Sequence, residues 1–290
     1  MPVSKTFPTV GLIADGPTTG MFLAPAKALG IELLCFESTD AVLRNAQKCD
    51  VVSIIQNTAS PTFAKALEAV GVPVRPSSSA ITYARDRFDS RVDQDFHICV
   101  MVARSPHGQA TTWAPTEIFK TDGKWVMSVS PATHLSAELR EKAQKLALDF
   151  SAESVAIGVI AVEMSVKDEE VFIVNVDMHP QSSGNWTVDG AITNQYEQHL
   201  RAILDLPLGD PAMSAKFVVT GNFYCGHKPN MYRPYLHLMA RTPALKFHQY
   251  DNNSQPGELM GHLTLAGDDL PKLIEEIEHA LEYMQGDIDE

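Results

Sequence analysis

Short apolar runs alternate with amphipathic segments over the first quarter of the chain. The runs at residues 9–13, 31–36 and 51–55 have the length and the bounding turns of buried strands. The segments at 21–29 and 61–70 carry apolar residues at helical spacing. Strands that alternate with helices at short spacing predict a parallel sheet with crossover helices. We therefore expect an N-terminal α/β domain over residues 1–87.

The pattern changes near residue 95, where β-branched and aromatic residues become frequent. Strands are expected at 96–103, 112–120, 124–129, 156–164 and 170–176. Turn residues separate the first three, which predicts an antiparallel meander. Ser136 can cap one helix, and residues 193–204 have the apolar stripe of another. Residues 95–211 form the second expected domain.

The last part of the chain, residues 212–290, has the pattern of a small β module closed by a helix. Strands are expected at 216–224, 244–250 and 261–266. Asp268 or Asp269 can cap the final helix, whose apolar positions recur at helical spacing.

Composition narrows the class of protein. The 290 residues are 44% hydrophobic and carry a formal net charge of −13, with no run of Lys or Arg. A nucleic-acid partner is not expected, because such proteins present a basic stripe. The four cysteines are far apart, which argues against a zinc or disulfide framework. No apolar run approaches the length of a membrane span, so a cytoplasmic protein without membrane contact is expected.

Three ordered motifs carry specific information. The segment Gly158-Val-Ile-Ala-Val-Glu163 is followed by Ser182-Ser-Gly-Asn-Trp-Thr187 and then by Gln195-Tyr-Glu-Gln-His-Leu-Arg201. This series resembles the 5-(carboxyamino)imidazole ribonucleotide synthetase family, which is the ATPase subunit of phosphoribosylaminoimidazole carboxylase. The segments Gly71-Val-Pro-Val-Arg-Pro-Ser77 and Met260-Gly-His262 extend the likeness over most of the chain.

The resemblance implies an ATP-grasp fold: a pre-ATP-grasp α/β domain, an ATP-grasp core and a C-terminal module. It implies the ATP-dependent carboxylation of aminoimidazole ribonucleotide in purine biosynthesis, with ATP and Mg²⁺ as cofactors. Glu163 matches the family's first magnesium ligand, and Asp177 is a substitute for the second. Ser182, Ser183, Asn185, Arg201 and His262 are the candidates for the substrate loop.

This sequence departs from the family in several places. Only seven residues, 88–94, stand where the family has its lid subdomain with phosphate-binding lysines. Val176 occupies the motif position of the second metal ligand, and on a regular strand Asp177 would point the other way. Glu258 and Leu259 replace the family's Arg-Lys, which puts a carboxylate where a phosphate is expected. Asp15 and Pro17 alter the Gly-rich first turn.

These departures predict a degenerate, non-catalytic paralogue that acts as a scaffold or regulatory partner, as a homodimer or as a heterodimer with a full-length family member. Two alternatives remain open: an active synthetase, and a small-molecule binding protein that reuses the cleft. The motif Gln195–Arg201 and Trp186 are expected to be mainly structural. A new metal site formed by Glu163, Asp177 and His179 is a further alternative.

Overall fold

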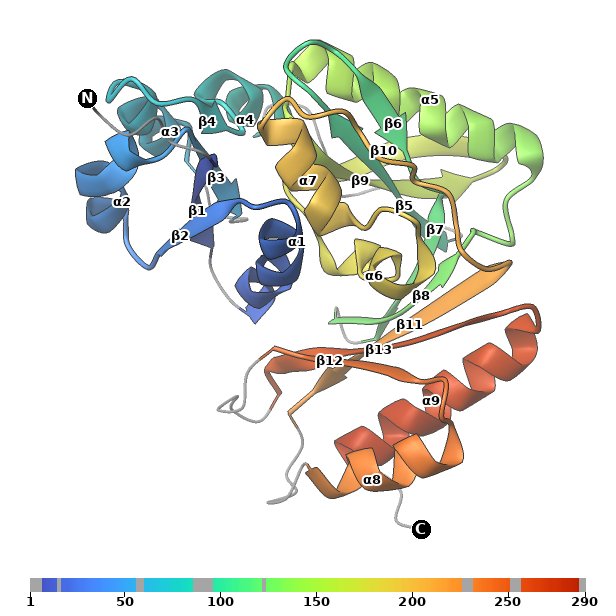
Figure 1. Cartoon of the computed structure of the whole chain (residues 1–290). Helices are drawn as coiled ribbons and strands as arrows, with labels where there is room; N and C mark the ends of the chain where they lie inside the picture. The colour runs from blue at the N-terminus through green and yellow to red at the C-terminus, as the bar shows by residue number, and fades with distance from the viewer. Residues whose placement is uncertain are drawn as a thin grey trace.

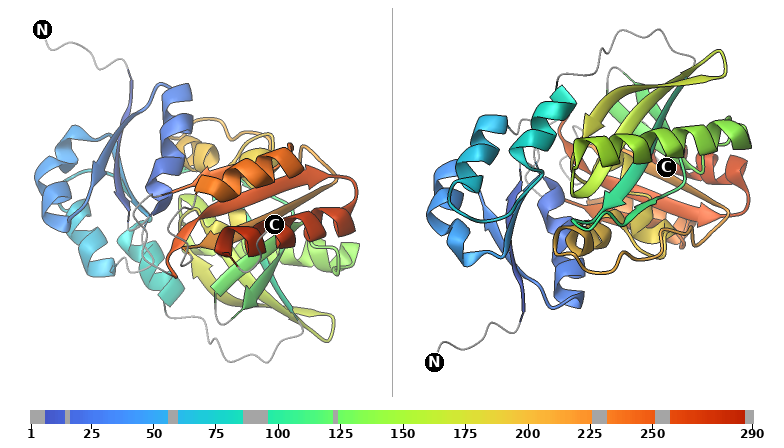
Figure 2. Two further views of the ribbon diagram at one scale, coloured as in Figure 1. Left: turned by 90° about the horizontal axis from the view of Figure 1, so that it is seen from below. Right: turned by 90° about the horizontal axis from the view of Figure 1, so that it is seen from above.

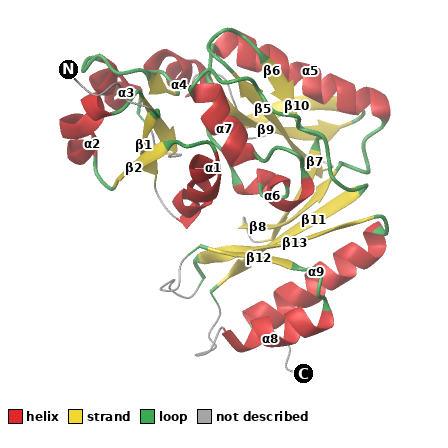
Figure 3. Cartoon of the chain, in the orientation of Figure 1, coloured by secondary structure: helices red, strands yellow, loops and turns green. Residues whose placement is uncertain are grey.

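The computed structural model describes residues 7–14, 17–55, 60–85, 96–121, 124–225, 232–250 and 257–286. In these ranges the chain forms one small and one large β-sheet, each flanked by helices (Figures 1 and 3). None of the helices in this part of the chain is long and apolar enough to cross a membrane.

The small sheet is parallel, with the strand order β2-β1-β3-β4. Its strands are β1 (Thr9–Ala14), β2 (Glu32–Phe36), β3 (Val51–Ile55) and β4 (Val74–Arg75). The helices around it are η1 (Pro17–Phe22), α1 (Leu23–Ala28), α2 (Thr39–Asn45), η2 (Ala46–Lys48), α3 (Pro61–Glu68) and α4 (Ser78–Arg85). The parallel α/β unit predicted from the alternating pattern is confirmed.

The large sheet is antiparallel, with the order β10-β9-β5-β7-β8-β11-β13-β12 and with β6 beside β5. Its strands are β5 (Phe96–Arg104), β6 (Ala110–Thr112), β7 (Thr116–Thr121), β8 (Lys124–Ser130), β9 (Gly158–Lys167), β10 (Glu170–Asp177), β11 (Phe217–Tyr224), β12 (Lys246–Gln249) and β13 (Leu259–Gly267). Because β8 pairs with β11, the expected second domain and the expected C-terminal module share one sheet.

Helices cover this sheet on both faces (Figure 2). Helix α5 (Ala137–Ser154), capped by Ser136, packs with the apolar cluster of β5, β9 and β10. On the other face lie η3 (Ser182–Gly184), α6 (Thr187–Gly190) and α7 (Gln195–Ile203). Helices α8 (Tyr232–Arg241) and α9 (Leu270–Gln285) pack with β11 and β13. Helix α8 was not predicted, so the C-terminal module is not all-β.

Helix α7 joins the two sheets. Its apolar side chains Tyr196, Leu200 and Ile203 pack in one buried cluster with Val10 of β1 and Phe22 of η1. Its polar side is buried as well, facing β9 and the loop before α6. The motif on this helix is therefore part of the core, as expected for a mainly structural role.

Candidate active site

Acidic side chains gather where β9 and β10 run side by side. Glu163 of β9 is the cross-strand neighbour of Asn175 on β10, and Asp177 lies two residues further along β10. The side-chain amide of Asn175 donates a hydrogen bond of 3.2 Å to Asp177 Oδ2. Glu163 and Asp177 are also close enough to influence each other's ionisation. The two metal-ligand candidates thus lie on one face of the sheet.

The position of the second ligand differs from the expectation. A β-bulge between Ile173 and Asn175 shifts the register, so the alternation of side chains along β10 changes there. Val176 consequently packs against the apolar core beneath α5, whereas Asn175 and Asp177 face Glu163. The side chain of residue 176 therefore does not lie on the face that carries Glu163. Asp177 does point away from Val176, and this places it on the face that carries Glu163.

Burial sets the ionisation of this acidic pair. Desolvation raises the pKa of Glu163, and Lys120 opposes that rise. The Nζ atom of Lys120 lies 3.9 Å from Glu163 Oε2 and 3.6 Å from the centre of the Trp125 ring. Desolvation likewise raises the pKa of Asp177 to about 6. Two carboxyl groups and one lysine are thus held where water solvates them poorly. A further cation bound there would stabilise the ionised carboxylates.

Polar atoms beside Glu163 are consistent with a site for a cation and the polar group that it would carry. Ser165 Oγ on β9 and His97 Nδ1 on the facing strand β5 are buried, and neither finds a hydrogen-bond partner in the part of the chain that the structure describes. Cys99 beside them stays a neutral thiol, because burial raises its pKa. The oxygen atoms of Glu163, Asp177 and Asn175 are the donor type that Mg²⁺ prefers.

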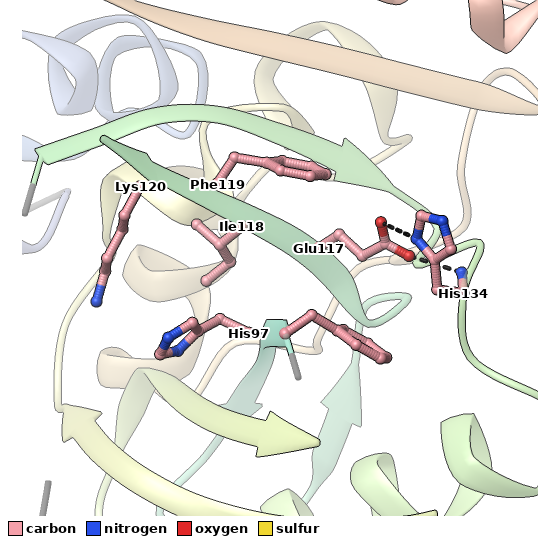
Figure 4. A pocket seen from close by; sticks show the side chains of 7 residues that line it. His97, Glu117, Ile118, Phe119, Lys120 and His134 are labelled. Atoms are coloured by element: carbon pink, nitrogen blue, oxygen red, sulfur yellow. Dashed lines mark hydrogen bonds and ion pairs between the residues drawn. The ribbon is translucent and has the colours of Figure 1, made fainter. Parts of the chain in front are cut away.

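A cavity of about 420 Å³ adjoins this acidic face. It is lined by residues from the start of β5, from β7 and from the loop before α5: Phe96, His97, Glu117, Ile118, Phe119, Lys120 and His134 (Figure 4). Glu117 lies at the far side of the cavity. Its carboxylate accepts one hydrogen bond from the main-chain N–H of His134 at 2.7 Å and another from the ring of His134 at 2.9 Å. Lys120 belongs both to the cavity lining and to the group around Glu163, so it connects the two.

Two of the substrate-loop candidates, Asn185 and His262, belong to a buried hydrogen-bond network. Asn185 Oδ1 accepts from Tyr196 (2.8 Å) and Gln195 (3.1 Å), while Asn185 Nδ2 donates to the hydroxyl of Tyr250 (2.7 Å). That hydroxyl lies 2.6 Å from His262 Nδ1 on β13. Asn185 and His262 are fully buried. They position the loop, because no side-chain surface of either is left to contact a substrate.

The remaining candidates divide between the loop and other places. The buried Ser183 donates to Cys99 Sγ at 3.3 Å, and Ser182 begins η3 with its side chain partly exposed. Arg201 is not part of this network: it forms an ion pair of 2.6 Å with Glu197 on its own helix. His179 does not join Glu163 and Asp177 in a metal-binding group, so that alternative is wrong.

Other departures from the family can be placed only in part. Asp15 and the segment 86–95 lie outside the described residues, so the prediction of a missing lid stays a prediction. Glu258 is exposed and Leu259 is partly buried at the start of β13. The structure adds Lys120, Asn175 and Tyr250 to the site. Strand pairing brings Asn175 and Lys120 to the acidic face, and it brings Tyr250 to His262.

Comparison with known proteins shows what this chain is similar to. The family model of the ATP-grasp domain matches residues 79–196. The N5-carboxyaminoimidazole ribonucleotide synthases of Mycobacterium tuberculosis and Mycobacterium leprae are 37% and 39% identical over 200 and 188 residues. These matches cover 68% and 62% of this chain but 47% and 43% of the relatives, so the chain spans about half the length of the curated relatives it matches.

Solved structures show the same fold. The N5-carboxyaminoimidazole ribonucleotide synthetase of Thermus thermophilus superposes with a TM-score of 0.81 at 22% identity, covering 97% of this chain and 99% of that one. The Aspergillus clavatus N5-carboxyaminoimidazole synthase, in complex with ADP and 5-aminoimidazole ribonucleotide, gives 0.85 at 18% identity with the same coverage. With its motifs, sheet topology and relatives in agreement, this chain belongs to the N5-carboxyaminoimidazole ribonucleotide synthase family and has the ATP-grasp fold.

Proposed function

We propose that the chain carries out the ATP-dependent carboxylation of aminoimidazole ribonucleotide, the activity expected of its relatives, in the cytoplasm. The observation that supports this is the shared face of Glu163, Asn175 and Asp177. The prediction of a degenerate paralogue rested partly on a lost second metal ligand, and the bulge in β10 supplies a carboxylate on the correct side. The substitution at Val176 therefore no longer argues against magnesium binding.

In this proposal Glu163 and Asp177 hold Mg²⁺, and Asn175 fixes the carboxylate of Asp177 through its amide. Bound magnesium would neutralise charge on the phosphates of ATP. Lys120 adds a second positive charge on the same side, at the boundary with the cavity. Because these groups are poorly solvated, their interactions with phosphate oxygens are stronger than they would be in water.

The cavity provides a place for the base of the nucleotide. Phe96 and Phe119 offer aromatic surface, and the strands β5 and β7 border it. The buried network around Asn185 and Tyr250 has a different role, because it holds η3 and the start of α7 in fixed positions. This leaves Ser182, which is partly exposed, as the side chain of the loop that can reach a substrate.

The test is phosphate release from ATP in the presence of Mg²⁺, bicarbonate and aminoimidazole ribonucleotide, against a blank without the ribonucleotide. We expect substrate-dependent release, and a loss on the order of 100-fold in Glu163→Gln, which removes one charge without changing shape. Glu170→Gln is the matched control, because Glu170 lies on β10 in an exposed ion pair with Lys142. Folded protein without release would overturn the proposal.

A second candidate is the non-catalytic scaffold or regulatory partner. The exposed carboxylate of Glu258 favours it, since the family's motif has basic residues at this point. In that case the folded chain would release no phosphate alone but would associate with a second copy or with a full-length family member. Sedimentation of the mixture together with the phosphate assay distinguishes the two candidates.

A further inference from the structure

Two histidines and an aspartate converge where the C-terminal hairpin meets α6. Asp189 of α6, His248 of β12 and His262 of β13 each offer a ligand atom, and these atoms all lie within 4.8 Å of one another. Among the residues that the structure describes, it is the one group of three or more His, Cys, Asp or Glu side chains whose ligand atoms come this close together. It shares no residue with the acidic face formed by Glu163 and Asp177.

Strand pairing creates the arrangement. His248 and His262 are direct cross-strand neighbours in the β12–β13 pair, and their rings stack with centres 4.5 Å apart and planes 17° from parallel. Helix α6 packs beside β13 and brings Asp189 Oδ2 to 2.7 Å from His248 Nε2. The sequence positions are 59 and 14 residues apart, so no motif spacing indicates the group.

One atom of the cluster lacks a partner. His262 is fully buried, and its Nε2 atom forms no hydrogen bond with the described residues. Buried polar atoms in folded proteins nearly always have a partner, so this nitrogen indicates a bound ion or water.

The other ring nitrogen of His262 is held in a way that suits a metal ligand. Its Nδ1 atom lies 2.6 Å from the hydroxyl of Tyr250, which also accepts a hydrogen bond from Asn185 Nδ2. Metal-binding histidines usually donate their second N–H to an oxygen atom, which fixes the ring. A metal bound at Nε2 would select the tautomer in which Nδ1 carries the proton and donates it to Tyr250.

Charge decides what kind of ligand fits. The carboxylate of Asp189 would repel an anion such as phosphate, while a cation would be attracted. Two imidazoles with one carboxylate are the donor set of first-row transition metals, whereas Mg²⁺ and Ca²⁺ prefer oxygen atoms alone. We propose that Asp189, His248 and His262 bind a divalent transition metal of the Zn²⁺ class, which clips the β12–β13 hairpin to α6.

The side chains must adjust their positions to bind one ion. Ligand atoms around one zinc ion lie roughly 3–3.5 Å apart, because each bond is about 2.0–2.2 Å long. The His248 ring, which stacks on His262, must also turn so that its nitrogen points at the ion. Asp189 and His248 have side chains that are 19% and 23% exposed, so both have room to move. His262, which is packed on all sides, serves as the fixed ligand.

The experiment is a calorimetric titration of the metal-free full chain with ZnCl₂, followed by the visible absorption of the Co²⁺ form. We expect one equivalent to bind at this site and to raise the melting temperature. Asp189→Asn and His248→Gln should each weaken binding about tenfold or more. Both side chains are partly exposed, so these variants should fold, which near-UV circular dichroism verifies.

The controls separate this site from other sources of zinc binding. His107→Gln changes an exposed histidine that pairs with Asp205, and Glu163→Gln changes the acidic face; the binding lost in His248→Gln should remain in both. Absence of zinc binding, or binding that Asp189→Asn and His248→Gln leave unchanged, would overturn the proposal and assign a buried water to His262 Nε2. The readout does not depend on the phosphate-release assay.

Discussion

His199 of α7 offers a test that combines packing with pH. Val159 N–H of β9 donates to His199 Nδ1 at 3.0 Å, and His199 Nε2 lies 2.8 Å from Ser53 Oγ of β3. Because Nδ1 accepts, Nε2 carries the proton and donates to the serine. One fully buried neutral ring therefore connects both sheets with α7.

Burial lowers the pKa of His199 to about 3, and the neighbouring His179 contributes to the same direction. A histidine whose pKa is depressed in the folded state supports stability above its unfolded pKa. That support is lost as the pH falls through the window from about 6.5 towards 3, because the unfolded chain takes up a proton that the folded chain cannot. Between pH 7 and pH 5 the loss amounts to about 2 kcal/mol.

The perturbation is His199→Ala, and the assay is urea unfolding at pH 7 and at pH 5. At pH 7 we expect the free energy of unfolding to fall by about 3–5 kcal/mol, since two buried partners lose their hydrogen bonds and a cavity forms. At pH 5 the difference from the unmodified protein should be smaller by about 2 kcal/mol, because the alanine variant has no such proton to exclude. Other titrating groups cancel in this difference, so an equal cost at both pH values would refute the reasoning.

Three further substitutions test other parts of the structure by urea unfolding at pH 7. Asp177→Asn should raise the free energy of unfolding of the ligand-free chain by about 1–2 kcal/mol, because a buried carboxylate with a raised pKa is a cost above that pKa; destabilisation would contradict this. Asn185→Leu should cost about 3–5 kcal/mol, since it breaks three hydrogen bonds, and a loss below about 1 kcal/mol would exclude the network's importance. Gly184→Ala should cost about 1–3 kcal/mol, because its Cβ would lie 2.1 Å from Met101 Sδ, whereas Gly20→Ala, with no atom within 4 Å, is the control.

The regular elements could be predicted because their apolar periods are strong. The strand at Val51–Ile55 is buried throughout, and the cap of the last helix is Asp269, as one of two expected candidates. Helix α8 was missed because Pro234 interrupts the pattern and three large apolar residues of the helix are exposed: Tyr232, Leu236 and Met239. Helix α6 has only four residues, so it is too short to show a helical period in the sequence.

The chemistry of the site was harder to predict, since strand register decides it. A single extra residue in β10 reverses which side chains face Glu163. The sequence around Val174 contains no residue type that would predict a bulge there. Tyr250 meets His262 only because β12 and β13 pair as they do. Spacing along the chain identifies candidate residues, but it does not say on which face of a sheet they lie.

The two kinds of motif in this family member have different meanings. Along the α7 motif, Gln195, Tyr196, Gln198 and His199 are all buried, and each forms hydrogen bonds to other parts of the chain. Retention of this motif follows from the need to hold the two sheets together, whatever the protein does. Glu163 is different, because burying a carboxylate beside Asp177 destabilises the ligand-free chain. A group whose burial costs stability is the better indicator of function, and for this reason the acidic face, rather than the longer motif, supports the proposed activity.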